Sequence, residues 1–135
     1  MDLLNVVLEI HSLVRWLVVA VSLIALIWFA LVWLRGMRNE KADRGLMAAF
    51  SGLIDAQVLI GLITILWSGF AGAGFPRYRL EHAAIMIIAA VVAHLSVRWR
   101  KADPRLRARN NVVLIMIVLV IVFIGVSLLP QGWSG

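Results

Sequence analysis

The sequence predicts an all-α integral membrane protein: an antiparallel, up-down-up-down bundle of four transmembrane helices with both termini on the outer side. The first observation is composition, since 63% of the 135 residues are hydrophobic, 15% are charged, and the mean hydropathy is +0.98. A soluble domain averages about 45–50% apolar and about 25% charged residues. A water-soluble enzyme and a disordered chain are therefore excluded. The absence of cysteine excludes thiol catalysis and thioether-linked haem.

The second observation is a series of four apolar stretches within one domain that covers residues 1–135. They comprise residues 6–34, 46–71, 80–97 and 111–129. About 20 residues cross a ~30 Å hydrocarbon core at 1.5 Å rise per residue, so each stretch is long enough to span as a helix. The segment Val112–Gly125 is apolar on every face. It therefore lacks the alternation of a membrane β-barrel strand.

The boundaries of these stretches carry the expected signals. The first stretch lacks a basic start, contains Arg15 and is longer than a signal-peptide core, so we expect it to remain as a helix. Gly69, Gly72, Gly74 and Pro76 are expected to break the chain between the second and third stretches, and Asp103 with Pro104 before the fourth.

The basic residues predict the orientation. The first and third loops are rich in Lys and Arg, whereas the second contains only Arg77 and Arg79. The positive-inside rule then places the first and third loops in the cytoplasm, and both termini with the second loop outside. The formal net charge of +6 is explained by topology, which argues against nucleic-acid binding. The basic residues of the two cytoplasmic loops are Arg35, Arg38, Lys41, Arg44, Arg98, Arg100, Lys101, Arg105, Arg107 and Arg109.

All three histidines lie within apolar stretches, where a strongly polar side chain needs a partner. By the predicted topology, His11 and His82 both lie within roughly 10 Å of the outer interface, on helices that run in the same direction. Two imidazoles at one depth are what a bis-histidine haem requires, since each axial ligand binds one face of the iron. Zinc is the weaker alternative, because no HExxH spacing or third soft ligand is nearby.

His94 cannot ligate the same iron as His82. Twelve residues correspond to ~18 Å of helix and a rotation of about 120°. We expect His94 near the inner leaflet, in a second polar cluster with Asp55 and Gln57. This cluster could hold a second haem, a quinone head group or a proton relay, and a structural contact of His94 with Asp55 or Gln57 is the favoured alternative.

Arg15 lies one helical turn from His11 and needs an anionic partner inside the membrane. The candidates are Glu81, Glu9 and the propionates of a haem bound at His11. A simple ion pair between Arg15 and Glu81 is one alternative.

The pattern of these residues resembles a known family. The motifs are His11-Ser12-x-x-Arg15-Trp16, Gln57-x-x-x-Gly61-Leu62, Glu81-His82-x-x-x-Met86 and Ala93-His94. They resemble a group of small four-helix bacterial membrane proteins described as cytochrome b-like. The resemblance implies a non-covalent haem b and a location in the bacterial inner membrane. In that family a histidine often stands two positions before the glutamine, where this chain has Asp55, which puts a second haem in doubt.

The sequence thus favours a membrane-embedded b-type cytochrome with one haem, bound by His11 and His82 as metal ligands, with Arg15 near a propionate. Gln57 and His94 are further candidates for cofactor binding. The expected role is one-electron transfer, coupled to a quinone or to other membrane subunits, rather than stand-alone catalysis. The expected partners are the lipid bilayer and other membrane subunits or further copies of this chain. The alternatives are a cofactor-free structural subunit of a larger respiratory or photosynthetic complex, a histidine that binds a pigment, and a small transporter.

Overall fold

A computed structural model describes residues 2–134 of the chain, and all regular structure within them is helical. The four long helices are α1 (Leu3–Arg35), α2 (Glu40–Ser68), α3 (Arg77–Ala93) and α4 (Pro104–Ser127). Three short helical segments extend the chain at Gly69–Ala73, His94–Trp99 and Gly132–Ser134. All four long helices are long and apolar enough to cross a membrane. The predicted all-helical class is confirmed, and so is the expectation of four helices long and apolar enough to span a membrane.

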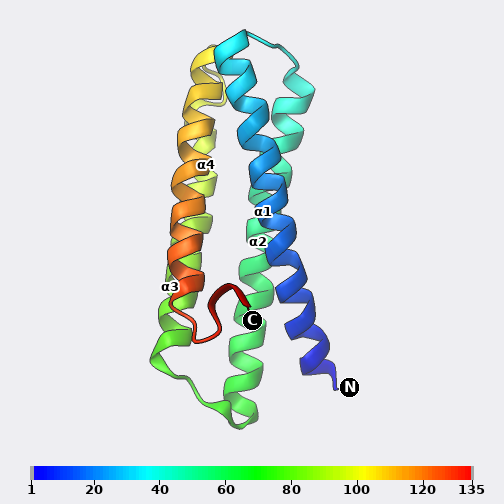
Figure 1. Cartoon of the computed structure of the whole chain (residues 1–135), viewed down its shortest axis with the longest axis vertical. Coiled ribbons are helices and arrows are strands. Elements are labelled where there is room, and N and C mark those ends of the chain that lie inside the picture. The colour runs from blue at the N-terminus through cyan, green and yellow to red at the C-terminus, as the bar shows by residue number, and fades with distance from the viewer. Residues whose placement is uncertain (1, 135) are drawn as a thin grey trace.

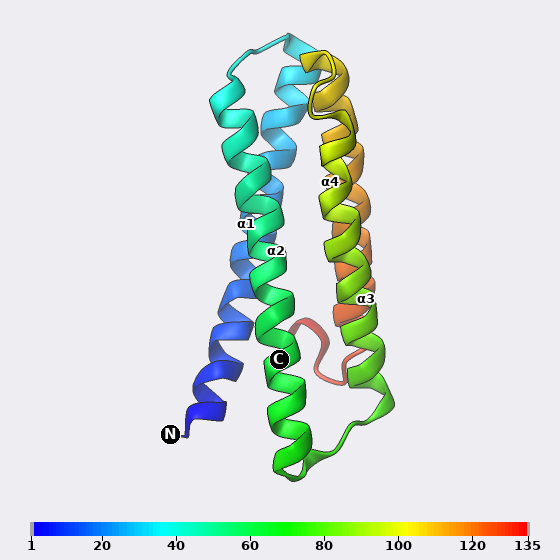
Figure 2. The ribbon, with the colours of Figure 1, turned by 180° about the vertical axis from the view of Figure 1, so that it is seen from behind.

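The helices form a ring in which each packs against two others. Helix α1 contacts α2 and α4, and α3 contacts the same two helices, so α1 and α3 stand at opposite corners. The α1–α2 and α3–α4 connections lie together at one end of the bundle (Figures 1 and 2). We call this the basic end. The N-terminus and the α2–α3 connection lie toward the other end, which we call the cavity end (Figure 1).

Side-chain caps set where the helices begin at the basic end. Asn39 accepts a hydrogen bond from the backbone N–H of Ala42 at the start of α2, and Asp103 accepts one from Arg105 at the start of α4. Pro104 then occupies the first turn of α4, where its missing N–H has no consequence. The helices therefore start earlier than the apolar stretches. As a correction, the basic residues that lie in the long helices rather than in loops are Arg35, Lys41, Arg44, Arg77, Arg79, Arg105, Arg107 and Arg109.

Glycines end α2 at the cavity end, as predicted. The chain continues from Ser68 into a wide helical turn at Gly69–Ala73, within which Gly72 has φ 122°. Gly74 has φ 70°, and side chains other than glycine rarely adopt either conformation. Pro76, with φ −64°, then precedes the first turn of α3. This run reverses the chain within a few residues.

The apolar core extends along the bundle, and its most deeply buried large side chains lie in the half nearer the basic end. Phe29 of α1, Phe50 of α2, Ala93 of α3 and Ile115 of α4 are each at most 1% exposed. Because these positions are fully packed, a cavity of useful size can only form in the other half. The core thereby fixes the helices around that cavity.

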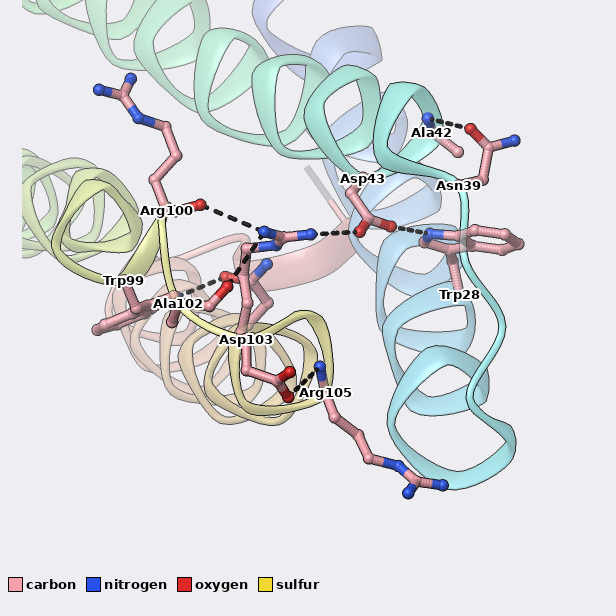
Figure 3. Close-up of polar contacts among 11 residues, drawn as sticks. Trp28, Asn39, Ala42, Asp43, Trp99, Arg100, Ala102, Asp103 and Arg105 are labelled. Atoms are coloured by element: carbon pink, nitrogen blue, oxygen red, sulfur yellow. Dashed lines mark hydrogen bonds and ion pairs between the residues drawn. The ribbon is translucent and has the colours of Figure 1, made fainter.

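A buried ion pair closes the basic end. The Arg107 guanidinium lies 3.1 Å from Asp43 Oδ2, and these side chains are only 14% and 7% exposed. The Trp28 indole N–H donates to the other Asp43 oxygen at 2.7 Å (Figure 3). Together the three residues join α1, α2 and α4. The sequence had placed Arg107 in a solvated loop, so this network was missed.

Candidate cofactor site

A cavity of about 440 Å³ lies between the four helices in the half of the bundle nearer the cavity end. Cofactor and ligand sites typically have volumes of ≈ 300–1,000 Å³. Its wall is mostly apolar, with contributions from Val18, Ile54, Met86 and Val122. Its polar lining comprises His11, Ser12, Arg15, Gln57, Thr64, Ser68, Tyr78, Arg79, His82 and Gln131. An apolar wall with a few convergent polar groups is the usual form of a cofactor site.

The two histidines singled out by depth meet in this cavity. His11 projects from α1 and His82 from α3, the helices at opposite corners of the ring, and both side chains line the cavity and are partly buried. Rings that approach one space from opposite sides can act on the two faces of a flat ligand. The structure therefore brings together the pair that a bis-histidine haem needs.

A backbone hydrogen bond orients His82. Its Nδ1 lies 2.8 Å from the carbonyl oxygen of Gly125 in α4, an acceptor, so Nδ1 carries the proton and donates it. The lone pair of the ring is then on Nε2, the atom available to a metal. Ligating histidines commonly donate their other ring N–H in this way, which fixes both tautomer and orientation.

Gln57 holds the helix segment that carries His11. Its amide nitrogen donates to the backbone carbonyl oxygen of His11 at 2.7 Å. Gln57 Oε1 and His11 Nδ1 are both buried, and neither has a hydrogen-bond partner among the described residues. An amide oxygen and a ring N–H are complementary groups, so a small rotation would join them and leave Nε2 of His11 as the ligating atom.

The placement of Gln57 corrects one prediction. Gln57 lies in the cavity with His11, not in a cluster with His94 and Asp55. The physical reason is helical rotation, because two residues along a helix are about 200° apart, so Asp55 and Gln57 point to opposite sides of α2. The periodicity of the sequence already contained this information.

The charges of the cavity are all positive. Arg15 from α1 and Arg79 from α3 both line it, while no Asp or Glu is among the lining residues. Arg79 donates to Ser68 Oγ at 2.8 Å, which holds it toward α2. Sequence reasoning assigned Arg79 only to the second loop and missed this role. Two guanidinium groups in a carboxylate-free cavity favour an anionic ligand.

The alternative in which Arg15 forms an ion pair with Glu81 is wrong. Glu81 pairs with Arg77 on its own helix at 2.7 Å, with the Glu81 side chain 42% exposed. It is absent from the cavity lining. Arg15 instead contacts Ser12 Oγ at 3.4 Å and lies over the rings of Trp16 and Trp133, with centroid distances of 5.2 and 5.7 Å.

The segment after α4 closes part of the cavity. Residues 129–132 line it, and the chain here turns back between the helices (Figures 1 and 2). The Trp133 ring packs against Phe123 at 6.1 Å and Trp16 at 5.8 Å between centroids. These aromatic contacts hold the segment after α4 against α1 and α4.

Gly61 provides a direct test of the cavity. A Cβ atom at this position would lie 3.0 Å from Cε1 of His11, which is closer than ordinary contact. We expect Gly61→Val to displace the His11 ring and to remove most of any ligand held there, measured as bound cofactor per chain. The matched control is Gly52→Val on the same helix, where nothing lies within 4 Å of the added Cβ. Equal cofactor content in the two variants would contradict this placement.

His94 lies outside the cavity, in a separate pair. Its Nε2 is 2.7 and 2.9 Å from the two carboxylate oxygens of Asp55, the structural contact that the sequence favoured. Among residues 2–134, no group of three or more His, Cys, Asp or Glu side chains is placed to hold a metal ion. His94 and Asp55 alone do not fit a zinc centre, which needs at least three protein ligands.

Comparison with known proteins finds no match to any protein family, curated protein or solved structure.

Proposed function

We propose that the chain is a membrane-embedded b-type cytochrome that holds one haem in the cavity, with His11 and His82 as axial ligands. The single observation that carries this proposal is the convergence of two histidines from opposite corners of the bundle on one mostly apolar cavity. The resemblance to cytochrome b-like membrane proteins supports the same conclusion.

The cavity fits a haem in three respects. His82 is already oriented by Gly125, which leaves Nε2 as the ligating atom. His11 Nδ1 and Gln57 Oε1 are buried polar atoms whose hydrogen bonds remain to be made. Arg15 and Arg79 would pair with the two anionic propionates of haem, whose ring is otherwise largely apolar.

Each residue has a separate task in this proposal. A bound haem would accept and release one electron reversibly. His11 and His82 would hold the iron, while Arg15 and Arg79 would neutralise the carboxylates and fix the orientation of the haem in the cavity. The apolar wall excludes water and lowers the local dielectric, which tunes the potential together with the two nearby positive charges.

The proposed location is the bacterial inner membrane. The basic end would face the cytoplasm, since it carries most of the Lys and Arg residues, and both termini with the α2–α3 connection would lie on the outer side. The cavity would then lie in the outer leaflet. Electrons would enter and leave through lipid-soluble carriers or neighbouring membrane subunits.

The arginines give a graded test of the anionic site. We expect Arg15→Gln and Arg79→Gln each to weaken haem binding by about tenfold or more, because a hydrogen bond to a charged group contributes ≈ 1.5–3 kcal/mol. The midpoint potential should also fall, since a nearby positive charge favours the reduced iron. Haemin titration and redox titration of the purified variants measure both effects.

The control for this prediction is Arg77→Gln. Arg77 is 91% exposed and pairs with Glu81 outside the cavity. If Arg77→Gln weakens haem binding as much as the other two variants, the arginines act through general charge rather than through the cavity.

Titration of the detergent-purified apo-protein with haemin tests the function itself. Saturation at one haem per chain, with the spectrum of a low-spin bis-histidine complex, is the expected result. Saturation at two would add His94 as a ligand, and an absence of binding would favour a cofactor-free structural subunit.

A further inference from the structure

A second polar site lies on the outside of the bundle, between α2 and α3. His94 stands where the α-helical part of α3 ends and the 3-10 segment His94–Trp99 begins. Its Nε2 lies 2.7 and 2.9 Å from the Asp55 oxygens. The side chains are 53% exposed for His94 and 48% exposed for Asp55.

Exposed apolar side chains flank this pair on the side nearer the cavity end, where Leu59 on α2 is 60% exposed and Val91 on α3 is 61% exposed. Ser51 and the exposed Arg98 lie one turn away on the other side, toward the basic end. Both helices are long and apolar enough to cross a membrane, which would place the apolar side of the pair in hydrocarbon. Polar and ionisable groups at that depth are rare, because they need polar partners. A ligand that reaches the pair must therefore dissolve in the bilayer and carry hydrogen-bonding groups.

The pair is arranged as a base with an orienting carboxylate. Both carboxylate oxygens of Asp55 face Nε2, so Nε2 carries the proton and donates it to them. The lone pair of the imidazole is then on Nδ1. In a Ser-His-Asp triad, a carboxylate likewise fixes the tautomer of a histidine whose other nitrogen takes a proton. Asp55 fixes the tautomer of His94 in the same way and leaves Nδ1 as the atom that can accept a proton.

The pair adjoins the wall of the cavity. Ile54, the residue before Asp55, lines the cavity and is 3% exposed. Ala89 of α3 also lines it and precedes His94 by five residues, or ~7.5 Å of helix. A ligand at the pair would therefore be separated from a cofactor in the cavity only by residues of α2 and α3 such as Ile54 and Ala89.

We propose that the Asp55–His94 pair binds the hydroxyl of a membrane quinol and accepts its protons as the quinol is oxidised by the haem. This inference rests on the proposed function, because the haem is the oxidant. Oxidation of one quinol to quinone breaks two O–H bonds and releases two electrons and two protons. A haem held in the cavity would accept these electrons one at a time, and a one-electron acceptor in a neighbouring membrane subunit would reoxidise it between the two. His94 Nδ1 would take the first proton, release it to water at the basic end, and then take the second.

The chemistry of the pair favours a quinol over a second copy of this chain. A quinol arrives through the lipid, offers an O–H donor to the Nδ1 lone pair, and gives up its electrons singly. Leu59 and Val91 suit its apolar ring and tail. A second copy would have to cover two half-exposed polar groups in hydrocarbon with groups of its own.

The test uses the haem-loaded protein in phosphatidylcholine nanodiscs, without oxygen. Decylubiquinol and menadiol are mixed with it, and haem reduction is followed at the α band. The variants are Asp55→Asn and His94→Gln. The control is Ser51→Ala, which lies one turn from Asp55 on α2 and loses only a hydrogen bond to the Met47 carbonyl.

We expect both variants to keep the haem and its reduction by dithionite, while reduction by quinol slows by about 100-fold, since general base catalysis typically contributes 10²–10⁴-fold. Ser51→Ala should match the unaltered protein. Quinol reduction at the unaltered rate in both variants overturns the proposal. If the variants keep the unaltered rate and light scattering shows that they have lost dimers formed by the unaltered protein, the pair would instead contact a second copy of the chain.

The Asp55–His94 site can also be tested without haem, which separates this inference from the proposed function. If the protein holds no haem, the cytochrome proposal fails on its own. The site is then tested without haem by photolabelling with an azido-quinone, and labelled peptides that contain Asp55 or His94 would support it. Labelling spread evenly over all four helices would overturn it.

Discussion

Replacement of His82 by alanine is expected to abolish the b-type haem spectrum while the protein still inserts into the membrane. His82 is one of two imidazoles in the cavity, and its orientation by Gly125 would be lost with the ring. His11→Ala should have the same effect, because a bis-histidine iron needs both ligands. The measurement is haem per chain in the purified protein, with circular dichroism to verify the helices.

The matched control is His94→Ala. His94 lies outside the cavity and contacts Asp55, so its removal should leave nearly all of the haem in place. Retention of haem in His82→Ala, or its loss in His94→Ala, would move the iron to another ligand set and contradict the assignment.

Replacement of Arg107 by methionine is expected to lower the free energy of unfolding by about 3–5 kcal/mol, since it leaves the buried Asp43 carboxylate without its cation. The Trp28 hydrogen bond alone cannot compensate for that charge. Unfolding in mixed micelles with increasing dodecyl sulfate measures the change. The haem content of the folded fraction should stay the same, because this pair lies at the basic end.

Two variants make this prediction specific. Arg105→Met removes a neighbouring arginine, which donates to the Trp33 carbonyl from an exposed position, and should cost about 1 kcal/mol or less. The double variant Asp43→Leu/Arg107→Leu removes both charges and should recover most of the stability. A single Arg107→Met variant as stable as Arg105→Met would show that the pair is not buried in the membrane-embedded protein.

The fold was predictable because its determinants are local. Runs of apolar residues longer than the bilayer is thick specify helices directly, and Gly72, Gly74 and Pro76 mark a break that the structure contains. The helix starts at Glu40 and Pro104 were missed, because hydropathy does not register polar first turns. The caps Asn39 and Asp103 were the signals that could have found them.

The candidate site was predictable where depth alone decides. His11 and His82 both line the cavity because they lie at similar depths on the parallel helices α1 and α3. Asp55 meets His94 because they lie at similar depths on the antiparallel helices α2 and α3. Depth does not say which face of a helix a residue occupies. Gln57 was therefore assigned to the wrong cluster, although rotation by 100° per residue would have separated it from Asp55.

Other features depend on tertiary packing that no local pattern carries. Arg79 was assigned to a loop, yet it lines the cavity because α3 begins earlier than its apolar stretch. The return of residues 129–132 into the bundle follows from the packing of Trp133 on Trp16 and Phe123. Contacts between segments so far apart in the sequence require the assembled helices.

The most direct test of the central claim is a reduced-minus-oxidised absorption spectrum of the detergent-purified protein, made in cells with adequate haem supply, with haem quantified as the pyridine haemochrome. A sharp b-type α band at about one haem per chain is the result that two axial histidines and one cavity predict. Protein that is folded and helical but contains no haem would contradict the account.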